Sequence, residues 1–130
     1  MKTFIAVVHK DPKSAYGVSF PDLPGCFSAA DTLEALLPNA CEALSLWFED
    51  SDAVVPRDIA AIRSEVADDL AQGAFLLAVP RVSNAGKSVR VNLSLDRGTV
   101  EAIDAAAASR RMTRSAFVAE AARNEIQGGH

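Results

Sequence analysis

Three polar residues that could read DNA bases alternate with apolar residues near position 90. They are Arg90, Asn92 and Ser94. Arginine can make paired hydrogen bonds to guanine and asparagine to adenine, while serine can bond to either base. The positions between them are apolar, so residues 88–95 are predicted to form a strand with one polar and one apolar face. The alternative is an exposed strand whose polar face meets only water.

A second polar group lies at the predicted start of the last helix. Thr113 can cap a helix that runs to about residue 126, and another helix is predicted from Asp96 to about Ser109. The unpaired amides at the start of the last helix suit a phosphate, with Thr113, Arg114 and Ser115 as the contacts. A plain helix cap is the alternative. The positions expected to face inward are Val100, Ile103, Ala107, Phe117, Val118, Ala121 and Ala122.

One strand and two short helices cannot bury their own apolar residues, because a lone strand has no pairing partner. The economical solution is a homodimer through residues 88–126, in which two strands pair antiparallel in front of four helices. Such a ribbon fits the major groove of DNA. We therefore predict base contacts from Arg90, Asn92 and Ser94.

The first part of the chain has a different pattern. Strands are predicted over residues 2–9, 16–20 and 26–30 as an antiparallel meander, followed by a helix and a fourth strand over 74–79. Asp31 or Thr32 can cap the first helix, whose Pro38 predicts a kink or a loose first turn. Its apolar face is Leu33, Leu36, Leu37, Ala40, Leu44, Trp47 and Phe48. A second helical stretch before Gly73 has the apolar stripe Ile59, Ile62, Val66 and Leu70.

The charge changes sign between these parts. Residues 1–86 hold 6 Lys and Arg against 12 Asp and Glu, and residues 87–130 hold 7 against 5, which together give the net charge of −4. We predict a domain over residues 1–82, a linker over 83–87 and a domain over 88–130. The acidic part could meet a basic protein and the basic part nucleic acid. An ordinary solvated surface explains the split equally well.

Two cysteines, Cys26 and Cys41, match no metal-binding spacing and are expected to be reduced thiols. No apolar run is long enough for a membrane span, and none near Met1 resembles a signal peptide. We therefore expect a cytoplasmic protein without a membrane partner.

Two stretches resemble known families. Val89 to Ile126 resembles a ribbon-helix-helix DNA-binding domain, through the run from Arg90 to Leu95 and the run from Met112 to Phe117. Residues 2–80 are similar to the HicB antitoxin family. That similarity is carried by residues 20–27, Asp31-Thr32, Asn39-Ala40 and the run from Glu42 to Leu44.

The resemblance implies an α+β protein, with a partial ribonuclease H-like βββα(α)β domain followed by a dimerising ribbon-helix-helix domain. It implies an antitoxin that neutralises a HicA-type mRNA-cleaving toxin and represses its own operon at operator DNA, as a homodimer or a higher oligomer. The toxin contacts stay open. The family usually has Gly where this chain has Arg111. A left-handed residue there would cost Arg about 1 kcal/mol, so a differently shaped turn is expected.

Two other functions compete with this one. A ribbon-helix-helix repressor with a small-molecule or protein-sensing first domain would need a deep apolar pocket. A nuclease would need clustered carboxylates, for which the candidates are Asp22, Asp31, Glu34, Glu42 and Glu49. Capping explains Asp31 and Glu34, and a solvent-facing helix surface explains Glu42 and Glu49. His9 has no nucleophile partner. We expect no enzyme, no catalytic residue, no metal and no cofactor.

Overall fold

The computed structural model describes residues 1–10, 12–51, 53–83 and 88–128. The chain divides into two compact units, whose main bodies are Met1–Val82 and Ser83–Ile126. Most of the predicted linker, residues 84–87, lies outside the described residues. Within the described ranges, no helix has both the length and the apolar character needed to cross a bilayer.

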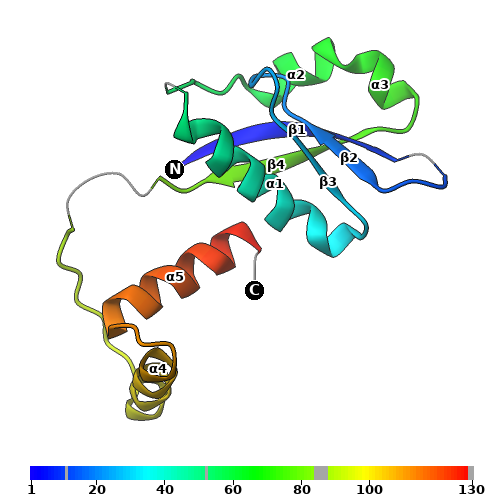
Figure 1. Ribbon diagram of the computed structural model, residues 1–130. Helices are drawn as coiled ribbons and strands as arrows, with labels where there is room; N and C mark the ends of the chain where they lie inside the picture. Colours follow the sequence, from blue (N-terminus) through cyan, green and yellow to red (C-terminus); the bar gives the residue numbers. More distant parts are fainter. Residues whose placement is uncertain (11, 52, 84–87, 129–130) are drawn as a thin grey trace. The chain divides into compact units, whose positions relative to one another are not determined.

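The first unit is built on a four-stranded antiparallel sheet (Figure 1). Its strands are β1 (Lys2–Lys10), β2 (Tyr16–Ser19), β3 (Phe27–Ala30) and β4 (Phe75–Arg81), in the order β3-β2-β1-β4. The predicted meander of the first three strands is therefore confirmed. β4 pairs with the other side of β1, from Lys2 opposite Arg81 to Val8 opposite Phe75, which makes β1 an internal strand.

Helices cover both faces of this sheet (Figure 1). α1 (Leu33–Glu49) lies on one face, and α2 (Ile59–Glu65) with α3 (Ala67–Ala71) lies on the other. β1 serves both cores because successive side chains of a strand point to opposite faces. Its residues Phe4, Ala6 and Val8 pack in the α1 core, and Ile5 and Val7 pack in the α2 core.

The caps and apolar face of α1 follow most of the predicted pattern. Thr32 rather than Asp31 is the cap, because its Oγ1 accepts a hydrogen bond of 3.3 Å from the amide of Ala35. Leu36, Ala40 and Leu44 are buried, but the predicted inward residue Leu33 is 58% exposed. It is the first helical residue and lies one turn before the first buried one. The helix continues through Pro38, whose missing amide leaves the Glu34 carbonyl without its helical donor.

The second helical stretch is two helices, not the single one predicted. α2 ends at Glu65, and its C-cap Val66, with a φ of −106° and a ψ of 23°, separates it from α3, which begins at Ala67. Ile62 and Val66 are buried as predicted, whereas Ile59 is exposed because it too is the first residue of its helix. Gly73 follows with a φ of +103°, which confirms its predicted place after the helix end.

The second unit has two helices, α4 (Arg97–Ser109) and α5 (Arg114–Gln127). Both predicted caps form, because Asp96 accepts from the Thr99 amide at 3.1 Å and Thr113 from the Ala116 amide at 3.1 Å. The predicted strand over residues 88–95 is absent from the single chain, which offers no second strand to pair with it. Ala107 is buried, but Ala121 and Ala122, predicted to face inward, are exposed in the single chain.

The turn between α4 and α5 has the left-handed residue that glycine usually supplies. Arg111 has a φ of +56°, so the expectation of a differently shaped turn is wrong. The amide of Met112 bonds to the Ala107 carbonyl at 2.8 Å, and the amide of Arg111 bonds to the Ala108 carbonyl at 3.1 Å. These are the two hydrogen bonds of a Schellman motif. They satisfy the helix-end carbonyls and hold Arg111 in a conformation that its Cβ disfavours.

Arg111→Gly is accordingly expected to stabilise the second unit by about 1 kcal/mol, because glycine adopts this conformation without a steric penalty. The measurement is the unfolding free energy of the full chain by chemical denaturation. Arg110→Gly is the control: its φ is −102°, and its guanidinium lies 5.4 Å from the centre of the Phe117 ring. That variant should be destabilised. If both variants are destabilised alike, backbone strain at Arg111 is not significant.

Candidate functional site

The residues predicted to contact bases are all exposed to solvent. Arg90, Asn92 and Ser94 lie in the segment that leads into α4. The apolar residues that alternate with them are also exposed, from 47% at Leu95 to 81% at Val89. A segment with so many exposed apolar side chains is unusual on the surface of a monomeric protein. The segment therefore has an uncovered apolar face as well as a polar one.

The residues predicted to contact phosphate begin α5. The Thr113 side chain caps the helix by accepting a hydrogen bond from the Ala116 amide, and Ser115 is exposed in the first turn. Arg114 donates from Nε and Nη2 to the two carboxylate oxygens of Asp104, each at 2.8 Å. This bidentate pair leaves Nη1 as a donor to other groups and sets the direction in which the guanidinium points. Sequence reasoning missed Asp104, because nothing in the spacing shows that α4 brings it beside the start of α5.

The Asp104–Arg114 pair makes the connection between α4 and α5 dependent on pH. The hydrogen bonds from Arg114 lower the pKa of Asp104 below its ordinary value. The contribution of the pair is complete above the ordinary aspartate pKa and is lost as the pH falls through the lowered pKa. Both side chains are largely exposed, so salt weakens the pair.

The carboxylates of the nuclease alternative do not come together. No group of three His, Cys, Asp or Glu side chains in the described part of the chain could hold a metal ion. Asp22 is paired instead: one carboxylate oxygen accepts from Nε of Arg57, and the other accepts from the Arg57 amide at 2.9 Å. Arg57 also donates to Glu65 at 2.9 Å. The Asp22 side chain is only 5% exposed, so its role is to tie the loop before β3 to the start of α2.

We therefore predict that the purified protein does not cleave RNA in the presence of magnesium or manganese. The reason is that Arg57 engages both oxygens of Asp22, the most buried of the candidate carboxylates. The measurement is cleavage of a labelled RNA by protein taken through several purification steps. Cleavage that persists in the wild-type protein and disappears in Asp22→Ala would contradict this, whereas persistence in both would identify a contaminant.

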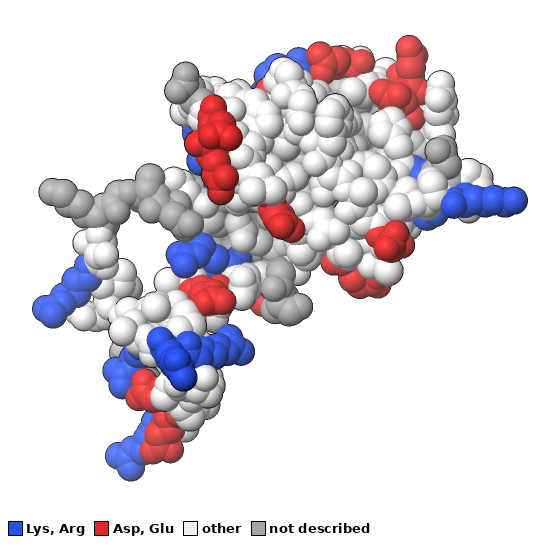
Figure 2. Space-filling view, viewed as in Figure 1, with Lys and Arg blue, Asp and Glu red and all other residues white. Residues whose placement is uncertain are grey.

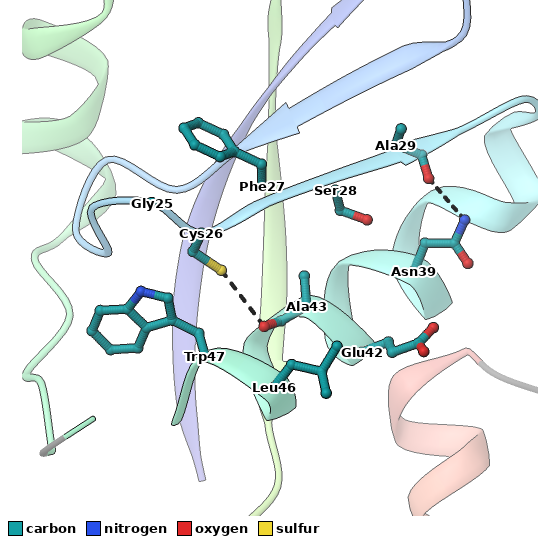
Figure 3. Close-up of a pocket in the computed structure, with 10 residues that line it drawn as sticks. All are labelled: Gly25, Cys26, Phe27, Ser28, Ala29, Asn39, Glu42, Ala43, Leu46 and Trp47. Carbon is teal, nitrogen blue, oxygen red and sulfur yellow. Dashed lines mark hydrogen bonds between the residues drawn. The ribbon is translucent and has the colours of Figure 1, made fainter. Parts of the chain in front are cut away.

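A groove of about 530 Å³ lies between β3 and α1 in the first unit (Figure 3). At one end, Trp47 donates from Nε1 to the Pro24 carbonyl at 3.0 Å. At the other end, Asn39 donates from Nδ2 to the Ala29 carbonyl at 2.9 Å. The groove is open to solvent and has both polar and apolar walls. It is lined by Gly25, Cys26, Phe27, Ser28, Ala29, Asn39, Glu42, Ala43, Leu46 and Trp47.

This groove is not the deep apolar pocket that a small-molecule sensor would need. Sequence reasoning missed it, although Asn39 and Glu42 belong to the segments that carried the family resemblance. Cys26 borders it as a buried thiol, and Cys41 is also buried; both are free, in line with the predicted reduced thiols, but their burial was not predicted. Burial raises the pKa of Cys26, and it raises the pKa of Cys41 to about 11. Both side chains are therefore thiols near neutral pH, when they are poor nucleophiles.

Known proteins resemble the whole chain. The sequence model of the HicB-like antitoxins of bacterial toxin–antitoxin systems matches residues 4–122. The crystal structure of the Burkholderia pseudomallei antitoxin HicB is 32% identical, with a TM-score of 0.52 and 100% of each chain covered. The crystal structure of antitoxin HicB3 is 29% identical, with a TM-score of 0.51, and the match covers 95% of this chain and 97% of that one.

A curated relative matches a shorter stretch. An uncharacterised 14.9 kDa protein of Haemophilus phage HP1 is 49% identical over 45 residues, which is 32% of this chain and 34% of the phage protein. The chain thus spans about a third of that relative. The match to the antitoxin family is much more extensive, and it includes both the sheet of the first unit and the two helices of the second. The chain therefore belongs to the family of HicB-like antitoxins of bacterial toxin–antitoxin systems.

Proposed function

We propose that this protein is an antitoxin that neutralises a HicA-type mRNA-cleaving toxin with residues 1–82 and represses its own operon with residues 88–130. The observation that carries the proposal is membership of the antitoxin family over residues 4–122. The order of strands and helices in the first unit, βββα(αα)β, is compatible with a partial ribonuclease H-like fold.

The first unit is suited to a basic toxin by its charge. Residues 1–86 carry a balance of −6, which attracts a positively charged protein and steers its approach. The unit also has its own sheet and two cores, and the buried residues of both cores all come from the stretch between Phe4 and Val79. A toxin-binding role can therefore belong to this unit alone.

The second unit has an exposed apolar face suited to dimerisation and a polar face suited to DNA binding. Val89, Val91, Leu93 and Leu95 are exposed in the single chain, and pairing with the same segment of a second copy would cover them. In that ribbon-helix-helix arrangement, Arg90, Asn92 and Ser94 of both copies lie on one surface and contact bases in the major groove. Thr113, Arg114 and Ser115 contact phosphate at the start of α5.

Residues 1–82 alone are expected to restore growth to cells that make the toxin, because neutralisation needs only the first unit. The measurement is colony formation with the toxin under an inducible promoter and the antitoxin fragment on a second plasmid. Residues 83–130, produced at the same level, are the control and should give no rescue. If the full chain restores growth and residues 1–82 do not, the assignment of neutralisation to the first unit alone is wrong. If neither rescues, the chain is not an antitoxin of that toxin.

A further inference from the structure

We infer that the groove between β3 and α1 receives an arginine or lysine side chain of the toxin. This inference rests on the proposed function and names the surface through which the first unit would act. Phe27, Glu42 and Leu46 of the groove lining are exposed, on a unit whose sheet is packed on both faces. Neither residues 88–95 nor the helices α4 and α5 contribute to its lining.

The ends of the groove are held in place before any partner binds. The hydrogen bond from Trp47 to the Pro24 carbonyl fixes one edge of the indole, and Phe48 packs against it edge-on with ring centres 5.0 Å apart. Asn39 is fixed at the opposite end by its bond to Ala29. A partner therefore meets a preorganised site, which reduces the entropy lost on binding.

The walls of the groove match the two parts of a long basic side chain (Figure 3). Leu46, which is 57% exposed, and Trp47 provide an apolar surface for the aliphatic stem. The indole face attracts a cation. Glu42 lies one turn before Leu46 on the same side of α1 as Leu46, and it offers a carboxylate toward the other end of the groove. No lysine or arginine of the described chain forms an ion pair with Glu42, so its charge is available to a partner.

The charge around the groove favours a basic protein over other occupants. Residues 14–56, which contain β2, β3 and α1, include no lysine or arginine. In Figure 2, acidic side chains are scattered over a mostly uncharged face of this unit. Nucleic acid would be repelled, and so would the same acidic face of a second copy. The acidic residues of the segment are Asp22, Asp31, Glu34, Glu42, Glu49, Asp50 and Asp52.

The first experiment measures the affinity of the full chain for the HicA-type toxin encoded beside it, with the toxin's active site inactivated. Glu42→Gln and Leu46→Ser are each expected to weaken binding by about tenfold or more, since the first removes the carboxylate charge and the second removes the apolar wall. Asp68→Asn is the matched control. It makes a similar change of charge on α3, on the opposite face of the sheet, and should change the affinity by less than about twofold.

The second experiment uses Trp47 as the reporter, because it is the only tryptophan in the chain. Titration with the tripeptide tri-arginine should change its fluorescence in a saturable way at low salt, and Glu42→Gln should remove that response. Tri-glutamate should give no response. Circular dichroism melting of each variant checks that exposed substitutions have not unfolded the unit.

The outcomes separate this inference from the proposed function. If the toxin binds the wild-type chain and both groove variants equally tightly, the groove is not the docking surface, although the antitoxin function stands. If the toxin does not bind the wild-type chain, the proposed function fails and the inference fails with it. If sedimentation shows self-association that Leu46→Ser abolishes, a second copy occupies the groove and the inference is wrong.

Discussion

Arg90→Ala and Asn92→Ala proteins are expected to fold and dimerise normally but to lose most of their affinity for operator DNA. Each side chain that makes a base contact contributes about 1–3 kcal/mol of discrimination, and a symmetric dimer loses two such contacts per substitution. The expected loss is therefore about 2–6 kcal/mol of specific binding. Folding is hardly affected because both side chains are exposed in the single chain.

Fluorescence anisotropy with the DNA upstream of the gene measures this loss, and Arg114→Ala is the comparison. A phosphate contact carries no sequence information, so that variant should bind all sequences more weakly and show a flatter salt dependence. Part of its effect will come from the loss of the Asp104 pair between the helices. If the Arg90 and Asn92 variants are dimeric and keep both affinity and sequence preference, the ribbon does not read the DNA.

Leu93→Asp is expected to convert the protein from a dimer to a monomer at micromolar concentration. Leu93 is 63% exposed in the single chain, but pairing of two segments would bury it in the dimer core. An unpaired carboxylate in such a core costs several kcal/mol, and the dimer contains two, so dimerisation weakens by about 1,000-fold or more.

Light scattering and sedimentation of the full chain provide the measurement for Leu93→Asp. The control is Asn92→Asp, which places the same carboxylate on the polar face of the same segment and should leave the dimer intact. A wild-type protein that is monomeric at these concentrations would contradict the dimer proposal directly. A Leu93→Asp protein of unchanged mass would show that another surface holds the copies together.

Local patterns predicted most of the elements, because caps and strand alternation depend on neighbouring residues. Asp96, Thr113 and Gly73 each have the predicted role at a helix end, since the groups they satisfy lie within one helical turn. Leu33 and Ile59 show where this reasoning fails. Helical periodicity assigns a residue to a face, but it does not say whether the first turn of the helix already lies over the sheet.

The candidate sites could be predicted only in part, because they depend on contacts between distant segments. Arg57 pairs with Asp22, 35 residues earlier, and no short-range rule connects them. The groove needs β3 and α1 to lie side by side, with Trp47 reaching back to the carbonyl of Pro24. The left-handed Arg111 is a different case: the Schellman hydrogen bonds override the preference of the residue itself.

The pairing of β1 with β4 has a consequence for the nascent chain on the ribosome. Val8 lies opposite Phe75, so the first strand cannot be completed on that side until the last strand of the unit has been synthesised. At about 5–20 residues per second, the wait is roughly 3–13 s. Throughout it, the apolar run from Phe4 to Val8 lacks one of its neighbouring strands, and until α2 has been synthesised Ile5 and Val7 also lack the cover of that helix. Early translation is thus the period in which this unit is most prone to aggregate or to be captured by a chaperone.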